Sequence, residues 1–397
     1  MIIWLAMLIP VLVAIFLLIF YRRKMLWWEF FIPLFFSFLL VVIFKLTISK
    51  VQTTDIEYWG GYVTQVQYFE AWDEWVVQIC TRTYACGQDS YGNTEWCTET
   101  YDCSHSVNHS EEWHAIESNG FDIEISEAEY NRLVKQFGIK PKFIDLNRDY
   151  YTEDGDLYQV DWDNTKPERF EPVTTEKFYE NRVQAAHSIF SFPDVSDSIK
   201  AQYNLIDYPK TTNPFHVPGI LGAKVPGMQK AERQLDYLNA TLGAPKKIRI
   251  WILLFRNQPL DAGQYQEWYW KGGNKNEFIL AIGLDNSNAI QWVHPISWTP
   301  VERLKVDAQY FIDSMKTQEL DLTAVVYWLG KNIQASWVKK DFREFNYLTI
   351  DPPGWAIAVT FIVTLLVNIA ISFWLVLNEY NEEEQKMTSR YRYSSPY

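Results

Sequence analysis

The four cysteines of the chain are the residues whose spacing most directly suggests chemistry. Cys80, Cys86, Cys97 and Cys103 lie in one short window. The inner pair, Cys86 and Cys97, and the outer pair, Cys80 and Cys103, are centred on the same point of the sequence. Turn-forming residues at 87–93 separate the inner cysteines. A hairpin folded about this turn places Cys86 opposite Cys97 and Cys80 opposite Cys103, close to disulfide geometry. The sequence therefore predicts a disulfide in each pair.

The cysteines have other interpretations, which the sequence leaves open. Four thiolates could hold zinc, although the two Cys-x5-Cys intervals are wider than those of common zinc sites. A mixed site could use His105, His109 or His114, and free thiols are a further alternative. These histidines fall in a loop and then a strand, whose faces do not converge, so unconnected surface histidines are favoured over a metal site. Disulfides are favoured if the window faces an oxidising compartment.

The other polar clusters do not match a known catalytic pattern. The sequence contains no nucleophile elbow, phosphate loop, His-Glu-x-x-His or dinucleotide fingerprint. One acidic stretch lacks the spacing of a calcium loop and is favoured as a solvated hairpin tip. We therefore assign no catalytic residue, no metal ligand and no cofactor. The acidic stretch consists of Asp149, Glu153, Asp154, Asp156, Asp161 and Asp163.

Tryptophan is abundant, with 18 residues in the chain. Large rings pack well in a core, which is the favoured interpretation of most of them. The alternative is an exposed aromatic patch that binds a protein partner or a glycan. Trp268, Trp270 and Trp298 are the candidates for such partner contacts.

Three apolar runs lie at the two ends of the chain, and they must position everything between them. They cover Met1–Phe20, about Trp28–Ile48 and about Trp355–Leu377. Each is close to the roughly 20 residues that a helix needs to cross a bilayer. A cleaved signal peptide is disfavoured for the first run, because no cation precedes it and a second run follows at once. The sequence predicts three transmembrane helices, two N-terminal and one C-terminal.

The charges between the first two runs predict the orientation. The loop Tyr21–Lys24 contains Arg22, Arg23 and Lys24, and short cationic loops stay in the cytoplasm. The large middle domain is then extracytoplasmic, and the tail after the third run is cytoplasmic. The chain carries a formal net charge of −13, which argues against nucleic acid as a partner. The expected partners are the lipid bilayer and another membrane or extracytoplasmic protein, and the sequence is compatible with an oligomer.

The middle of the chain changes character along its length. Alternating patterns predict a strand-rich module, with a hairpin at Asn119-Gly120 and a helix that Ser126 caps and Gly138 ends. Prolines dominate the next stretch, which we expect to be a linker or long loop. A helix stopped by Gly243, a buried strand at 248–255 and a helix started by Thr299 follow, in the order of an α/β layer. The predicted fold class is therefore an α+β membrane protein, divided into 1–50 (two transmembrane helices), 51–170 (strand-rich module), 171–226 (linker), 227–350 (α/β module), 351–378 (transmembrane helix) and 379–397 (cytoplasmic tail).

The α/β order resembles that of the TPM domain, a small module often tethered by membrane helices. The residues that carry the resemblance are 248–255, Trp268-Tyr269-Trp270 and 276–282, about a quarter of the chain with its surroundings. It implies either complex assembly or phosphatase activity, and none of that family's acidic metal ligands maps onto this chain. The whole chain is similar to uncharacterised membrane proteins of bacteria and some large phages.

The function expected from these patterns is a non-enzymatic, membrane-anchored scaffold or partner-binding protein. Its disulfide-stapled β module and TPM-like module would bind a partner at the membrane. The alternative is a membrane-tethered, metal-assisted phosphohydrolase. A divalent cation bound by clustered carboxylates in the α/β half would favour the alternative, and a large apolar interface with another chain would favour the first.

Overall fold

The computed structural model describes residues 2–20, 27–88, 90–146, 155–162, 169–186, 188 and 190–393. The chain forms two compact units. The first contains Met1–Ile56, Phe178–Pro193 and Asp341–Tyr397, and the second contains Glu57–Lys177 and Asp194–Lys340. We call them unit 1 and unit 2.

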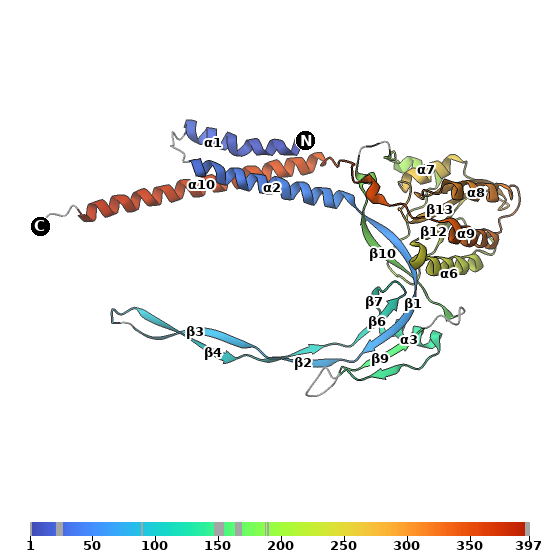
Figure 1. The fold of residues 1–397 in the computed structure, drawn as a ribbon, viewed down its shortest axis with the longest axis horizontal. Helices are drawn as coiled ribbons and strands as arrows, with labels where there is room; N and C mark the ends of the chain where they lie inside the picture. The colour runs from blue at the N-terminus through green and yellow to red at the C-terminus, as the bar shows by residue number, and fades with distance from the viewer. Residues whose placement is uncertain are drawn as a thin grey trace. The chain divides into compact units, whose positions relative to one another are not determined.

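Unit 1 is built on three apolar helices, α1, α2 and α10 (Figure 1). Windows within 2–19, 30–53 and 354–375 are long and apolar enough to cross a membrane, which confirms the three predicted apolar helices. The cationic loop at 21–24 lies outside the described residues. The elements of unit 1 are η1 (Ile2–Met7), α1 (Leu8–Phe20), α2 (Trp27–Thr53), α4 (Arg182–Ala185), η3 (Phe342–Phe345) and α10 (Gly354–Tyr393).

A polar contact joins two of these helices. Asn368 of α10 is fully buried and donates a 2.7 Å hydrogen bond to the hydroxyl of Ser37 in α2. An amide inside an apolar helix is costly unless it has such a partner. This contact therefore fixes which faces of α2 and α10 meet.

Unit 2 contains a six-stranded sheet with strand order β7-β6-β1-β9-β8, and β10 also pairs with β1. Helix α3 packs on it through Leu133 and Phe137, against Val63 and Val160. As predicted, the Ser126 side chain caps α3 and Gly138 ends it in a left-handed conformation. The elements are β1 (Thr54–Phe69), β6 (Glu112–Glu117), β7 (Asp122–Glu124), α3 (Glu127–Phe137), β8 (Lys142–Ile144), β9 (Leu157–Asp161) and β10 (Pro172–Glu180).

A second sheet of unit 2 has the order β11-β12-β13-β14, with the first three strands parallel and β14 antiparallel. Alternate residues of β12 enter two different cores, so the sheet is covered on both faces. Helices α6, α8 and α9 pack on one face, and α5 and α7 on the other. The elements are α5 (Asp197–Tyr203), β11 (Ile220–Gly222), α6 (Met228–Lys246), β12 (Arg249–Arg256), α7 (Asp261–Tyr269), β13 (Glu277–Leu284), β14 (Ile290–Ile296), α8 (Glu302–Asp313) and α9 (Leu322–Ser336).

The stretch expected to be a linker, 171–226, contains regular structure. It holds β10, α5 and β11, and β10 and β11 each pair with a sheet strand. Its prolines lie mostly between these elements, where they do not interrupt a ladder. The segment 214–218 packs on two cores of unit 2. Phe215 is buried in the core of the six-stranded sheet, and Val217 is buried in one core of the second sheet.

Two helix boundaries differ from the sequence prediction. Gly243 does not stop α6, which continues to Lys246. A Cβ atom at Gly243 would lie 1.9 Å from the carbonyl oxygen of Gly60 in β1, so this glycine permits close packing. Helix α8 begins at Glu302 with Val301 at its N-cap and without a side-chain cap, because the Thr299 hydroxyl accepts a hydrogen bond from the N–H of Val301, before the first turn of the helix.

Candidate interaction surface

The cysteine window forms a long two-stranded ribbon within unit 2 (Figure 1). Strand β2 (Trp72–Val76) pairs with β5 (His105–His109), and β3 (Ile79–Gln88) continues into its partner β4 (Thr94–Asp102). Among the described residues, β3 and β4 pair only with each other, so both ribbon edges carry free backbone groups. None of the described residues of β3 and β4 is buried, and most of them are exposed.

Disulfides close the ribbon at two places. Cys80 is bonded to Cys103 and Cys86 to Cys97, with Cα–Cα distances of 5.8 and 5.6 Å. These are the pairs that the palindromic spacing predicts. A two-stranded hairpin is marginal in water by itself, so these bonds replace the missing core.

The cross-strand register differs from the predicted one. Cys80 lies opposite Tyr101, and Cys97 lies opposite Tyr84, so neither cysteine faces its disulfide partner directly. A bulge between Ala85 and Gly87 places Cys86 outside the regular ladder. The extra residue of a bulge shifts the pairing of everything beyond it, which spacing alone does not reveal.

The two faces of the ribbon carry different side chains. Opposed residues face the same side, and the side alternates along each strand. One face holds the disulfides, Tyr84, Tyr101 and the ion pair between Arg82 and Glu99, with the Arg82 guanidinium 5.7 Å from the Tyr101 ring. We call it the tyrosine face. The rings of Tyr84 and Tyr101 are 43% and 45% exposed.

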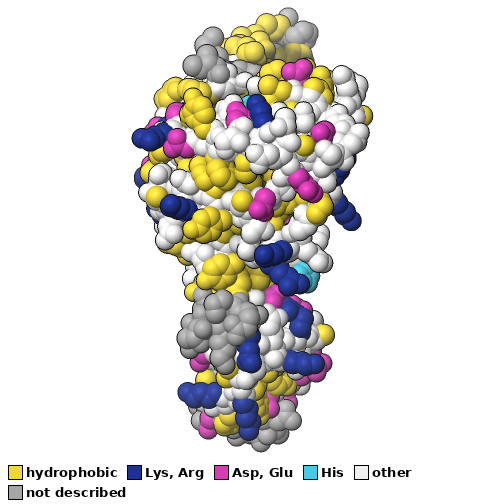
Figure 2. Space-filling view, turned by 90° about the vertical axis from the view of Figure 1, so that its right-hand side faces the viewer, with side chains coloured by type: hydrophobic (Ala, Val, Ile, Leu, Met, Phe, Trp, Pro, Cys, Tyr) yellow, Lys and Arg dark blue, Asp and Glu magenta, His cyan; other side chains and the backbone are white. Residues whose placement is uncertain are grey.

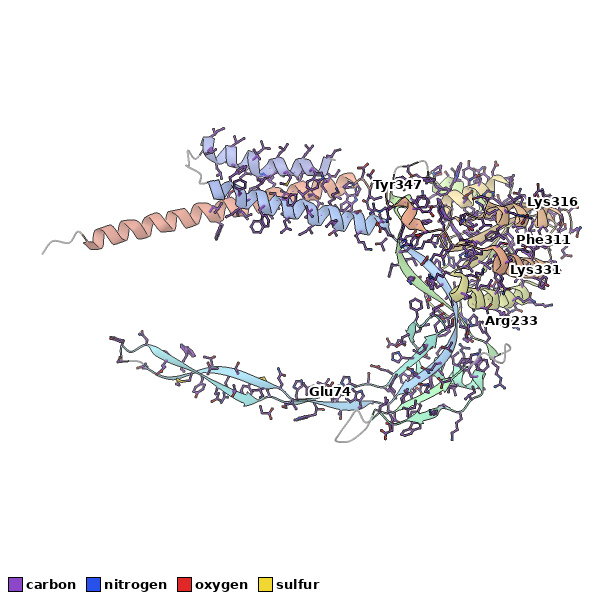
Figure 3. The ribbon with its side chains drawn as sticks, viewed as in Figure 1. Glu74, Arg233, Phe311, Lys316, Lys331 and Tyr347 are labelled. Carbon is purple, nitrogen blue, oxygen red and sulfur yellow. A yellow bond between two sulfur atoms is a disulfide. The ribbon has the colours of Figure 1, made fainter. Side chains whose placement is uncertain are left out.

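The opposite face carries Ile79, Trp96 and the threonines of both strands, and we call it the tryptophan face. Ile79 is 74% exposed and Trp96 is 65% exposed. Thr83 and Thr98 are paired across the strands, with their hydroxyl oxygens 3.5 Å apart. Large apolar side chains are thus presented to solvent by a rigid strand pair. Figure 3 shows side chains projecting from both sides of the ribbon.

The ribbon is also acidic. Residues 72–109 include six acidic side chains and one basic one. On the part of the molecule shown in Figure 2, by contrast, Lys and Arg side chains are interspersed with Asp and Glu. Hydrogen bonds from Ser104 lower the pKa of Asp102, which keeps this carboxylate charged.

The histidines considered as metal ligands do not come together. The His109 ring stacks on Trp72 at 4.3 Å and lies 2.9 Å from the Glu74 carboxylate, at the position labelled in Figure 3. His114 belongs to β6 and contacts Asp122 at 2.8 Å. Within the described part of the chain, no group of three metal-ligating side chains is found. Asp149, Glu153, Asp154 and Asp163 of the acidic stretch lie outside the described residues.

The three tryptophans proposed as partner contacts occupy different environments in unit 2. Trp270 is 3% exposed, donates to the carbonyl of Ile206 and stacks on Tyr208 at 3.8 Å. Trp298 is half-buried and donates to the carbonyl of Gly273. Trp268 is half-buried against Tyr265. Their role in partner binding stays a prediction, whereas the more exposed rings of the ribbon were not selected from the sequence.

Alternation in the sequence could have identified those ribbon residues. The residues two positions before and after Tyr84, Trp96 and Tyr101 are Arg, Glu, Thr or Cys, so none of these rings belongs to an apolar stripe along its strand. Comparison of the chain with protein-family models, curated proteins and solved structures finds no match.

Proposed function

We propose that the protein is a membrane-anchored binding protein whose disulfide-closed ribbon recognises a protein partner. The observation that carries the proposal is the set of exposed rings on a rigid strand pair without a core. Folding leaves these rings in water, where they contribute little to stability, so their burial against a partner would be favourable. Aromatic anchors of this kind dominate binding energy at interfaces.

The negative charge of the ribbon indicates which charge its partner should carry. Five net negative charges in 72–109 are repelled by anionic lipid headgroups and by a second acidic ribbon. We therefore assign the occupant as a different protein with a basic contact face. The tryptophan face and the open edge of β4 supply apolar anchors and strand pairing for it.

The location of the ribbon follows from compartment chemistry. Disulfides persist in oxidising compartments and are rare in the cytosol, and the cationic loop at 21–24 favours the cytoplasmic side. Both considerations support an extracytoplasmic ribbon. The partner would then be an extracytoplasmic protein or the outer part of a membrane protein. The TPM-like activity and the metal-assisted phosphohydrolase stay predictions, and no contact among the described residues favours them.

The test begins with a photo-crosslinking phenylalanine analogue at position 98 of the full chain in its native cells, because Thr98 is exposed on the tryptophan face and its replacement leaves Trp96 in place. The adduct identifies the partner by mass spectrometry, and the purified partner is then titrated with the full chain in detergent. Trp96→Ala is expected to weaken binding roughly 30-fold, the equivalent of about 2 kcal/mol. Raising the salt concentration should weaken binding further, because the contact is charged.

Tyr310→Ala is the matched control, because Tyr310 is a 72% exposed ring on α8 that lies outside the ribbon. Its affinity should equal that of the unchanged protein. Adducts formed only with lipid or with a second copy of the chain would refute the proposal, as would an unchanged affinity of Trp96→Ala with both disulfides intact.

A further inference from the structure

Unit 2 contains a cavity that is separate from the ribbon. Its volume is about 240 Å³, and it is bounded by β10, the segment 214–218, α6 and β12. Sites for drug-sized ligands usually span about 300–1,000 Å³. This cavity is therefore suited to a smaller molecule, of the size of an amino acid.

One wall of the cavity is a buried cation. Arg249 is 2% exposed, and its guanidinium donates to the Thr174 hydroxyl at 2.9 Å and to the Val217 carbonyl at 3.0 Å. The guanidinium also lies over the Trp251 ring at 4.4 Å. Its Nε–H is buried without a hydrogen-bond partner, and no carboxylate of the described residues forms an ion pair with it. A permanently charged group with unused donors is costly in such a place.

The facing wall carries two carboxylates. Glu232 and Asp236 lie one helical turn apart on α6, and both line the cavity with Arg249. Glu232 accepts hydrogen bonds from the backbone N–H groups of Gly219 and Ile220. Asp236 has no hydrogen bond or ion pair with any residue that the structure describes. Burial raises the pKa of Asp236 to about 6 and that of Glu232 to about 7.

The two walls together restrict the ligand. A simple anion would be attracted by Arg249 but repelled by Asp236 and Glu232. A simple cation would be attracted by the two carboxylates but repelled by Arg249. A zwitterion satisfies both walls, because its carboxylate accepts from the guanidinium and its ammonium donates to the carboxylate. Arg249 and Asp236 both line the cavity and form no ion pair with each other, although the charge of Arg249 acts to lower the pKa of the Asp236 carboxyl.

We propose that this cavity binds a small zwitterion of the α-amino acid class, held between Arg249 and Asp236. The guanidinium recognises the ligand carboxylate, and Asp236 recognises its ammonium group. Glu232 stays bonded to the backbone and shapes the cavity. The proposal is independent of the ribbon, which lies elsewhere in unit 2 and shares no residue with the cavity.

The test titrates the purified full chain in detergent with L-alanine by calorimetry. Propionate and ethylamine serve as matched probes, since each is alanine without one of its charged groups. L-Alanine should bind at least tenfold more tightly than either. A peptide N-terminus has an ammonium group but no carboxylate on the same residue, so it should bind as weakly as ethylamine. The comparison of L-alanine with ethylamine therefore distinguishes a free amino acid from the N-terminus of a polypeptide.

Asp236→Asn keeps the shape of the side chain and should lower the affinity for L-alanine at least tenfold. Arg233→Gln is the control on the same helix, because Arg233 is exposed and outside the cavity (Figure 3). Arg249→Met tests the other wall, and Asp236→Asn remains decisive if that variant does not fold. Equal binding of the three probes, no binding of L-alanine, or wild-type affinity in Asp236→Asn would each overturn the proposal.

Discussion

The carboxylates of unit 2 differ in how many hydrogen bonds they accept. Glu277 is fully buried, yet its carboxylate accepts hydrogen bonds from Asn274, Trp251 and Tyr208 at 2.8–3.1 Å. Asp236 has no such partners among the described residues. The sequence could not predict this contrast. Two acids one turn apart usually mark a solvated helix face, and only the fold of 214–218 over α6 encloses them.

Asp236→Asn should stabilise the ligand-free protein above about pH 6. Burial raises the folded-state pKa of Asp236 above its usual value of 3.8, so the folded state binds the proton more tightly than the unfolded state. Stability is therefore lost as pH rises through this window. The charge of Arg249 opposes the rise in the pKa of Asp236, that of Glu171 adds to it, and that of His216 opposes it.

The expected gain at pH 8 is about 1–2 kcal/mol, because one pKa unit is worth about 1.4 kcal/mol and the site is partly hydrated. Urea unfolding of both proteins at pH 4 and pH 8 measures it. The gain should vanish near pH 4. A gain of equal size at both pH values would show that the effect is not electrostatic.

Gly243→Ala should destabilise unit 2 by about 2–3 kcal/mol, because the new methyl group would strike the backbone of Gly60. Gly330→Ala in α9 is the control. Its Cβ would meet the end of the Leu238 side chain at 3.0 Å, and a side chain can move where a backbone cannot. Thermal unfolding compares the two. Equal melting temperatures for both variants would contradict a backbone contact at Gly243.

At the scale of elements, strands and helices with strong local patterns were predictable. The hairpin at Asn119-Gly120 and helix α3 formed where turn and capping residues placed them. The ribbon shows the limit of such reasoning. Its strands and cysteine pairs follow from alternation and spacing, but the bulge at Cys86 depends on backbone geometry that the sequence does not specify. The role of Gly243 in α6 likewise depended on its close packing against Gly60 of β1, a residue distant in sequence.

Replacing Cys80 and Cys103 by serine should loosen the ribbon more than replacing Cys86 and Cys97. The outer bond has a sequence separation of 23 and the inner one of 11, and the chain-entropy model gives the larger effect to the longer loop, on the order of 3 kcal/mol. Hydrogen exchange of β3 and β4 measures the local opening. Exchange in β12 should not change, because the ribbon does not pack on that sheet.

Non-reducing peptide mapping checks the bonds themselves. It should yield peptides that join Cys80 to Cys103 and Cys86 to Cys97. A peptide that joins Cys80 to Cys86, or stoichiometric zinc in the purified protein, would exclude this pairing. Faster exchange in the inner-pair variant than in the outer-pair variant would contradict the loop-length argument.

For the whole molecule, composition alone predicted the three apolar helices, since length and hydrophobicity suffice to identify them. The α/β module was predictable because its strand 249–256 is buried on both faces. The strands β10 and β11 within 171–226 were not predictable, because they gain their stability from pairing with β1 and β12. Short strands of this kind have little local pattern, and distant neighbours determine them.

The orientation in the membrane is testable on the intact cell. A cysteine introduced at Asn93 should react with a membrane-impermeant thiol reagent, while one introduced at Ser395 should react only after permeabilisation. The reason is that the cationic residues 22–24 are expected to stay in the cytoplasm. The reverse pattern would place the ribbon in a reducing compartment and would remove the basis for its disulfides.

The nested arrangement of the two disulfides has a consequence for survival among proteases. The turn between β3 and β4 lies inside both bonds and is an exposed tip of the kind that proteases cleave first. A single cut there would separate the two strands in sequence but not in space, because Cys86–Cys97 and Cys80–Cys103 still join them. The nicked ribbon would keep its aromatic rings in place. The protein should therefore lose the continuity of its backbone at the turn and still present the tyrosine and tryptophan faces.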